Sequence, residues 1–119
     1  MNDTLRTLLK SKGRTVHTVS PEATVLDAVR KMNLERIGAL LVMKDDELVG
    51  IFTERDVLTR VVDQTRDPAA TRVAEVMTGN PVVVTAAATI NEAMAIVSEK
   101  RCRHLPVVDE GKLLGLVSA

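Results

Sequence analysis

The sequence predicts an α/β protein of the α+β kind, built from two tandem β-α-β-β-α repeats, and three observations lead to this fold class. The chain aligns with itself without a gap when it is shifted by 65 residues, so that "ALLVMKDDELVGIFT" (39–53) matches "HLPVVDEGKLLGLVS" (104–118). Apolar residues make up 45% of the chain but Phe52 is its only aromatic residue, which favours aliphatic strands with helices packed on them. A length of 119 residues suits one domain or two very small ones packed together.

Each repeat is expected to begin with a short strand and a helix. The strand is "TVHTV" in the first repeat and "PVVVT" in the second. The helix follows the N-cap residue Thr24 or Thr89, and each N-cap has a carboxylate three residues further on, as in a capping box. Apolar residues at helical spacing give each helix one core-facing stripe, formed by Val25, Ala28, Val29 and Met32 and by Ile90, Ala93, Met94 and Val97.

A hairpin and a second helix are expected next. "ALLVM" and "LVGIF" form strands around the turn "KDDE", as "LPVV" and "LLGLV" do around "DEGK". The helix "ERDVLTRVVDQ" closes the first repeat, whereas the second repeat stops at "GLVSA" and is expected to lack its last helix. An exposed apolar surface is therefore expected where that helix would cover the sheet.

A short amphipathic segment precedes each repeat, because Leu5, Leu8 and Leu9 match the spacing of Val73, Val76 and Met77. "TRDPAAT" (65–71) is the expected linker, given its proline and small polar residues. The expected domains are 1–64, the first repeat with the N-terminal segment, and 72–119, the second repeat. Neither repeat is large enough for a secure core. We therefore expect the two to pack face to face around a pseudo-two-fold axis, sharing a core and forming a cleft between them.

Charge and cysteine content exclude several classes of protein. Sixteen basic and sixteen acidic residues, with no long block of one sign, do not give the electrostatic footprint of a duplex-binding protein. Without Tyr or Trp there is no stacking platform for single strands. Cys102 is the only cysteine, which favours a reducing compartment, and no run resembles a signal peptide or a membrane span. We expect a soluble cytoplasmic protein that binds neither nucleic acid nor membrane.

The stretch "GIFTERD" (50–56) is the main candidate site, because it lies where a strand passes into a helix. Gly50 allows a close approach to a neighbouring segment. Thr53 is at the N-cap position, where free backbone N–H groups and the helix dipole favour phosphate. Arg55 adds a positive charge with paired donors, and Asp56 can accept both hydroxyls of a ribose. Thr-x-x-Asp is equally a capping-box pattern, so a purely structural role is the alternative.

The order of elements resembles that of a CBS domain pair, a family named after cystathionine β-synthase. The resemblance rests on "TVSPEATVLDAV", "GIFTERD", "VMTGNPVVVTAAATINEAM", "RHLPVVDEGKLLGLVS" and the duplication, and it covers nearly the whole chain. It implies a Bateman module, which binds an adenine ligand between its repeats: AMP, ADP, ATP, NAD or S-adenosylmethionine. It assigns a phosphate contact to Thr53 and a ribose contact to Asp56, and it implies a homodimer and a separate effector protein.

The resemblance also indicates residues outside this motif. Arg103 and His104, beside Pro106, would contact phosphates, although a solvated pair at a helix end is the alternative. Their counterparts in the first repeat are Gly38 and Ala39, so the two clefts cannot be equivalent.

Three further residues, Thr15, Val16 and Thr78, lie where family members hold the adenine ring. Lys10, Lys12 and Arg14 could border the same cleft, or be ordinary surface charge at a helix end. Ser118 corresponds to Thr53, but no residue of the second repeat in this sequence corresponds to Asp56.

Three functions follow from these observations. The leading hypothesis is a nucleotide-sensing regulatory module without catalysis. The second is a structural dimerisation module with vestigial clefts. The third, a small nucleotide hydrolase, lacks a P-loop, a metal-ligand cluster and an ordered base, and Cys102 with His104 lacks the further ligands that zinc requires. We therefore expect no enzyme activity and no bound metal.

Overall fold

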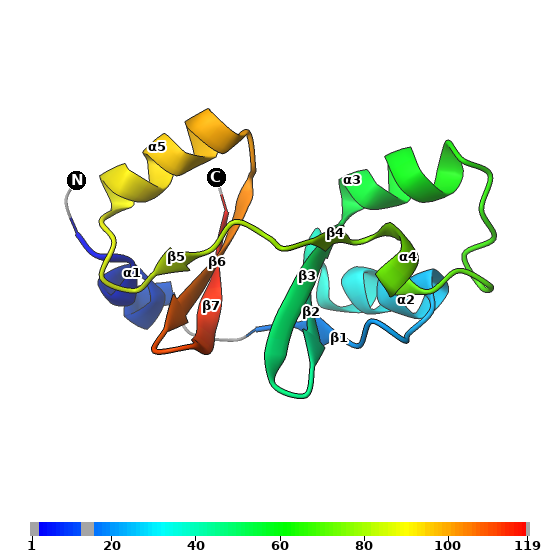
Figure 1. Ribbon diagram of the computed structural model, residues 1–119, viewed down its shortest axis with the longest axis horizontal. Helices are drawn as coiled ribbons and strands as arrows, with labels where there is room; N and C mark the ends of the chain where they lie inside the picture. Colours follow the sequence, from blue (N-terminus) through cyan, green and yellow to red (C-terminus); the bar gives the residue numbers. More distant parts are fainter. Residues whose placement is uncertain (1–2, 13–15, 119) are drawn as a thin grey trace. The chain divides into compact units, whose positions relative to one another are not determined.

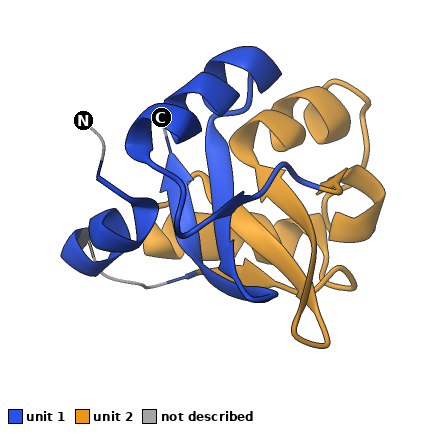
Figure 2. Cartoon of the chain, turned by 60° about the vertical axis from the view of Figure 1, so that its left-hand side comes forward, with its two compact units in different colours: residues 1–16, 81–119 blue, residues 17–80 orange. Residues whose placement is uncertain are grey.

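The computed structural model describes residues 3–12 and 16–118. The chain divides into two compact units, shown in different colours in Figure 2. The first-repeat unit is His17–Asn80, and the second-repeat unit combines Met1–Val16 with Pro81–Ala119. The segment that precedes each repeat in the sequence thus belongs to the unit of the other repeat. From the sequence we expected residues 1–16 to belong to the first repeat.

The first-repeat unit is a four-stranded sheet with four helical segments. Its elements are β1 (Thr18–Val19), α2 (Val25–Glu35), β2 (Ala39–Lys44), β3 (Glu47–Thr53), α3 (Glu54–Asp56), the π-helical η1 (Val57–Val62), α4 (Val73–Val76) and β4 (Thr78–Gly79). The strand order is β1-β2-β3-β4, with β1 parallel to β2 and the other pairs antiparallel (Figure 1). The sequence had not predicted β4.

The second-repeat unit repeats this plan in a shorter form. It contains α1 (Leu5–Lys12), β5 (Val84–Thr85), α5 (Ile90–Lys100), β6 (His104–Asp109) and β7 (Lys112–Ser118). The strand order is β5-β6-β7, with a parallel pair followed by an antiparallel one. The first strand of each unit is shorter than expected, because only two residues of each pair with the neighbouring parallel strand.

Tight hairpin turns determine the register of the long strands. Asp45 and Asp46 both have positive φ, as have Glu110 and Gly111. Two such residues form a two-residue turn whose twist matches that of the flanking strands. Counting back along the strands, with one shift in each pair, Ala39 faces Thr53 and His104 faces Ser118. The turns therefore place the candidate residues of each unit at matching positions.

The predicted N-caps are confirmed. The Thr24 hydroxyl accepts from the Asp27 N–H at 3.1 Å, and the Thr89 hydroxyl accepts from the Glu92 N–H at 3.1 Å. The Glu92 carboxylate in turn accepts from the Thr89 N–H at 3.3 Å, which completes a capping box.

The exchanged segments are held by matching backbone hydrogen bonds. In both units the donor–acceptor distances are 2.8 to 2.9 Å, and the pairs are Val25 N–Thr71 O and Val73 N–Ala23 O in one unit, and Ile90 N–Asp3 O and Leu5 N–Ala88 O in the other. The spacing match between the two amphipathic segments is thus a structural equivalence between α1 and α4.

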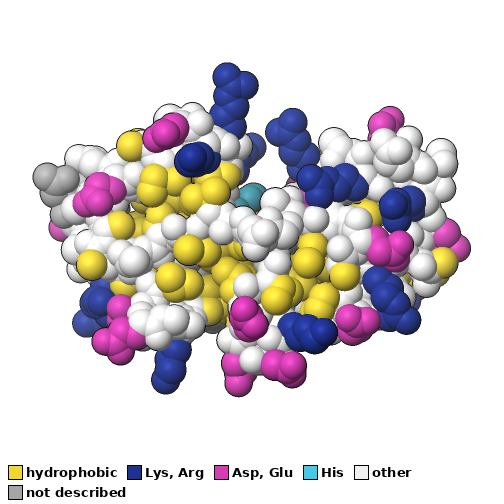
Figure 3. Space-filling view, viewed as in Figure 1, with side chains coloured by type: hydrophobic (Ala, Val, Ile, Leu, Met, Phe, Trp, Pro, Cys, Tyr) yellow, Lys and Arg dark blue, Asp and Glu magenta, His cyan; other side chains and the backbone are white. Residues whose placement is uncertain are grey.

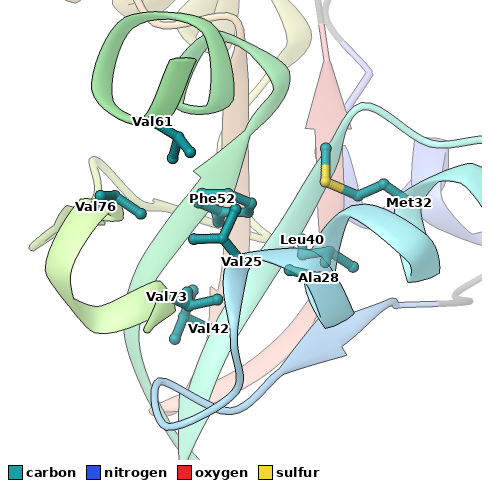
Figure 4. Packing of buried hydrophobic residues seen from close by; sticks show 9 residues of the cluster. All are labelled: Val25, Ala28, Met32, Leu40, Val42, Phe52, Val61, Val73 and Val76. Carbon is teal, nitrogen blue, oxygen red and sulfur yellow. The ribbon is translucent and has the colours of Figure 1, made fainter. Parts of the chain in front are cut away.

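Each unit has a hydrophobic cluster that includes its exchanged segment. Figure 4 shows the cluster of the first-repeat unit, in which Phe52 of β3 is fully buried among Val25, Ala28, Met32, Leu40, Val42, Val61, Val73 and Val76. The other cluster consists of Leu5, Leu9, Val84, Ala86, Ala93, Leu105 and Val107. Val117, the counterpart of Phe52, is half-buried, so the apolar surface expected over β7 is only partly exposed.

The N-terminus of α4 is tied to the expected linker. The Glu75 carboxylate accepts from the Arg72 N–H at 2.7 Å and from the Arg66 guanidinium at 3.2 Å. These donors, the Arg72 N–H above all, hold the pKa of Glu75 below its ordinary value, because they favour the charged carboxylate.

A glycine in each long second strand gives the exchanged segment room. A Cβ at Gly50 would lie 2.6 Å from Met77 Sδ and 2.9 Å from the Thr78 carbonyl oxygen. A Cβ at Gly115 would lie 2.8 Å from Leu9 Cδ2, on the equivalent segment. The close approach expected at Gly50 is therefore confirmed, and it recurs in the second repeat.

We predict that Gly50→Ala destabilises the protein by about 1–3 kcal/mol, the usual cost of overpacking a close contact. Gly115→Ala should cost less, because the nearest atoms are the terminal methyl groups of Leu9, whereas at Gly50 a backbone oxygen must also move. Gly79→Ala is the control, since a Cβ there would meet no atom within 4 Å. Urea unfolding of the three variants measures the order, and equal effects at Gly50 and Gly79 would contradict the steric account.

Candidate functional site

The end of β3 and the start of α3 form a fixed junction. Glu54 N donates to the Gly38 carbonyl at 3.0 Å, which ties the first residue of α3 to the residue before β2. The Glu54 side chain lies over Gly38, where a Cβ would be 2.9 Å from its Oε1. Thr53 therefore ends β3 and caps α3 at a position set by two neighbouring strands.

Thr53 and Asp56 bind each other in a complete capping box. Asp56 Oδ2 accepts from the Thr53 N–H at 2.9 Å and from the Thr53 hydroxyl at 3.2 Å. The Asp56 N–H donates to the Thr53 hydroxyl oxygen at 3.3 Å. The structural role that the sequence left open is thus present, whether or not a ligand also uses these groups.

Asp56 differs from an ordinary capping carboxylate in its burial. The residue is 5% exposed, and only Thr71 is also buried among the described polar and charged residues. Its Oδ1 lies 3.6 Å from Arg60 Nε, an ion pair across one helical turn. Burial of a charge is costly unless the charge is paired and hydrogen-bonded. The hydrogen bonds from Thr53 and the ion pair with Arg60 offset this cost for Asp56.

The sequence analysis did not identify Arg60 as a candidate residue. The i, i+4 spacing of Asp56 and Arg60 could have indicated it, because residues four apart in a helix lie next to each other and Asp with Arg at that spacing is a favourable pair. The π-helical turn that follows Asp56 carries Arg60, and the Asp63 N–H bonds to the Leu58 carbonyl five residues earlier.

Thr78 lies near Thr53. It pairs with Ile51 across the β3–β4 ladder, and Ile51 is two residues before Thr53, so all three side chains lie on one face of the sheet. Arg55 and Thr78 are exposed. Val16 is half-buried, Lys10 is exposed on α1, and Thr15, Arg14 and the Lys12 side chain lie outside the described residues.

The candidate residues of the second-repeat unit cluster at the matching place. His104 of β6 faces Ser118 of β7, and Pro106 faces Leu116 two residues along on the same face. Arg103 and Ser118 are exposed, His104 is half-buried and Pro106 is buried. The structure thus brings together Thr53, Asp56 and Thr78 in one unit, and His104, Pro106 and Ser118 in the other, but it does not group Val16 or Lys10 with either set.

Charged side chains of both signs are exposed on the molecule (Figure 3). Figure 3 shows Lys and Arg side chains interspersed with Asp and Glu over one face of the molecule. Within residues 3–12 and 16–118, no group of three or more His, Cys, Asp or Glu residues could hold a metal ion. Cys102 is half-buried and forms no disulfide. None of the helices described combines the length and apolar content that a membrane crossing needs.

Paired α/β units of this kind, each with a strand pair ending at a matching position, define a tandem-repeat module. The CBS domain family matches residues 13–63 and 73–119. The crystal structure of the CBS domain NE2398 superposes with a TM-score of 0.95 at 43% identity, covering 99% of this chain and 92% of that one. The chain therefore belongs to the CBS domain family, and it is a CBS domain pair, a regulatory and signal-transduction kind of module.

Two further relatives extend the comparison. CBSX3, a mitochondrial CBS domain-containing protein of Arabidopsis thaliana, is 35% identical over 97% of this chain. This chain spans only 60% of the length of CBSX3. The hexameric CBS-CP12 protein of bloom-forming cyanobacteria is 30% identical with a TM-score of 0.88, covering 99% of this chain and 65% of that one.

We predict that Asp56→Ala lowers the free energy of unfolding by about 1–3 kcal/mol, because the substitution leaves a partly buried Thr53 N–H without its acceptor and Arg60 without its counter-ion. Glu92→Ala removes the equivalent carboxylate from an exposed capping box, and we expect it to cost less than about 1 kcal/mol. Chemical unfolding of both variants measures the difference. Equal costs would show that the burial of Asp56 adds nothing to its role as a cap.

Proposed function

We propose that this CBS pair is a regulatory module that binds an adenine nucleotide, AMP, ADP or ATP, in the cleft between its repeats and catalyses no reaction. NAD and S-adenosylmethionine are the alternative adenine ligands. The observation that carries the proposal is the buried Asp56 carboxylate at the β3–α3 junction, within a motif that the family resemblance assigns to ribose.

The two carboxylate oxygens of Asp56 have different roles. Oδ2 accepts two hydrogen bonds from Thr53, which hold the carboxylate plane in place. Oδ1 lies 3.6 Å from Arg60 Nε, longer than a direct hydrogen bond. Oδ1 is therefore the oxygen that would accept a ribose hydroxyl, and its geometry is set before the ligand arrives.

The Thr53 hydroxyl is engaged with Asp56 as both donor and acceptor. To donate to a phosphate oxygen it must turn its proton away from Asp56 Oδ2, which would still keep the Thr53 N–H as a donor. Arg55 is exposed at this junction and would supply positive charge to the phosphate.

The family resemblance assigns further ligand contacts to residues of the second repeat. Arg103 and His104 are the proposed phosphate contacts, and Ser118 is the counterpart of Thr53. Pro106, two residues further along β6, is a further proposed nucleotide contact, and Thr15, Val16 and Thr78 are the proposed contacts of the adenine ring.

Regulation would follow from the difference in ligand affinity between two arrangements of the repeats or of dimer halves. A separate effector protein in the cytoplasm would respond to that change.

Calorimetric titration of the purified protein with AMP, ATP, NAD and S-adenosylmethionine tests the proposal. We expect at least one adenine ligand to bind, and binding at 100 times its Kd to stabilise the fold by about 2.7 kcal/mol. Asp56→Asn keeps the shape of the side chain but replaces one carboxylate oxygen by an amide NH2 group, which cannot accept a hydrogen bond from the ribose. We therefore expect this variant to lose the stabilisation by ligand. No heat with any of the four ligands would overturn the nucleotide proposal.

Glu92→Gln is the matched control for that titration, because it changes the carboxylate of the Thr89–Glu92 capping box in the same way. Ligand binding should survive in Glu92→Gln. Loss of binding in both variants would mean that the effect comes from helix capping and not from a contact with ribose.

A structural dimerisation module is the second candidate. Two large apolar residues one turn apart on η1, Leu58 and Val62, are 63% and 61% exposed. Oligomers occur in a relative, since the CBS-CP12 protein is described as hexameric. We propose a homodimer in which this apolar pair is covered.

Light scattering measures that association. We expect a dimer for the natural sequence and a shift towards monomer when Leu58 and Val62 are both replaced by Lys, because the charges would be desolvated in the interface. Leu34→Lys is the control, since Leu34 is 80% exposed on a different helix. If the dimer forms but no nucleotide changes its melting temperature, the structural function is supported over the sensor.

A further inference from the structure

One side chain, Arg60, connects the candidate site to the segment by which the chain leaves the first-repeat unit. Its Nε lies 3.6 Å from Asp56 Oδ1. Its Nη1 donates to the Met77 carbonyl at 2.9 Å and to the Val76 carbonyl at 3.3 Å. The planar guanidinium thus has donors directed at a buried anion and at the end of α4 at the same time.

The two carbonyls belong to the last residue of α4 and the residue after it. Carbonyls at a helix C-terminus have no partner within the helix, so a cation there satisfies them and favours the helix dipole. Arg60 is the side chain that supplies these donors, and it reaches them across sixteen and seventeen residues of sequence. The end of α4 is therefore held from η1.

The α4–β4 segment, residues 73–79, is packed closely against β3. Met77 fills the space over Gly50, and β4 pairs with Gly50 and Ile51. The unit ends at Asn80, and the chain continues into the second-repeat unit at Pro81. Met77 lies three residues before Asn80, the last residue of this unit.

We propose that Arg60 is a positioning residue that couples ligand occupancy at Asp56 to the end of α4. This inference rests on the proposed nucleotide binding. A ribose hydroxyl that donates to Asp56 Oδ1 competes with the guanidinium for the same oxygen. The attraction that holds Arg60 in place weakens, and its hydrogen bonds to Val76 and Met77 loosen with it.

The coupling is reciprocal, because a ligand that loosens the α4 terminus must bind better when that terminus is already loose. Ligand occupancy at Asp56 would thereby affect the segment that joins the repeats without any change in the hydrophobic cluster of the first-repeat unit.

Hydrogen exchange of the amides of residues 77–79, followed by NMR on the full chain, tests the coupling. The Met77 N–H bonds to the Val73 carbonyl at 2.8 Å, so its exchange reports the last turn of α4. We expect saturating AMP, or ATP where AMP does not bind, to raise these exchange rates roughly five-fold or more, the range of ordinary allosteric coupling.

Two variants remove the bridge in different ways. Arg60→Met deletes the charge, and Arg60→Lys keeps it but carries all its donors on one nitrogen, without the separate Nε and Nη1 groups that face Asp56 and the α4 carbonyls. Both should show fast exchange without ligand and no further change with it. Arg66→Met is the control, because Arg66 binds Glu75 at the other end of α4 and should leave the ligand response intact. An unchanged response in both Arg60 variants would overturn the proposal.

A second arm needs no ligand and separates this inference from the nucleotide proposal. Asp56→Asn removes the charge that faces Arg60, so it should raise exchange at residues 77–79 in the natural background but not in the Arg60→Met background. If no nucleotide binds yet this difference appears, the nucleotide function fails and the Arg60 link stands. If nucleotide binds but neither the ligand nor Asp56→Asn alters the exchange, the link fails and the binding function stands.

Discussion

The docking of each leading segment onto the other repeat's sheet is the constraint on which the rest of the fold depends. A single repeat of this size exposes too much of its sheet to be stable alone. α4 supplies the buried Val73 and Val76 to one unit, as α1 supplies Leu5 and Leu9 to the other. Only a strand without a side chain at the crossing point allows so close an approach, which explains the paired glycines at 50 and 115. The segments cannot leave without uncovering both clusters.

The same docking gives the candidate site its rigidity. β3 lies between β2 and β4, and its last residue passes straight into α3, so Thr53 and Asp56 are held by the sheet as well as by each other. Each unit has a capping box whose N-cap is a threonine, Thr53 with Asp56 in one and Thr89 with Glu92 in the other. Only the one at Asp56 has a buried carboxylate with a cation beside it, whereas Glu92 is exposed. Burial is the property that distinguishes the Asp56 carboxylate from that of Glu92.

Much of the fold could be predicted because it is encoded over short distances. Residues only a few positions apart determine the caps at Thr24 and Thr89, the hairpin turns and the apolar stripes of the helices. Because of the duplication, each of these patterns occurs in both repeats. β4 was missed since "TG" carries no strand pattern and pairs only because α4 delivers it to the edge of β3. The short first strands were overestimated because their apolar letters continue beyond the residues that find a partner.

The repeat, the family and the pair of residues at the centre of the candidate site could all be inferred from the order of residues along the chain. The unit that each leading segment joins, the burial of Asp56 and the contacts of Arg60 are visible only in the folded protein. The physical reason is the distance along the chain. A cap or a turn is chosen by its immediate neighbours, but a guanidinium that reaches carbonyls seventeen residues away depends on where an entire segment has docked.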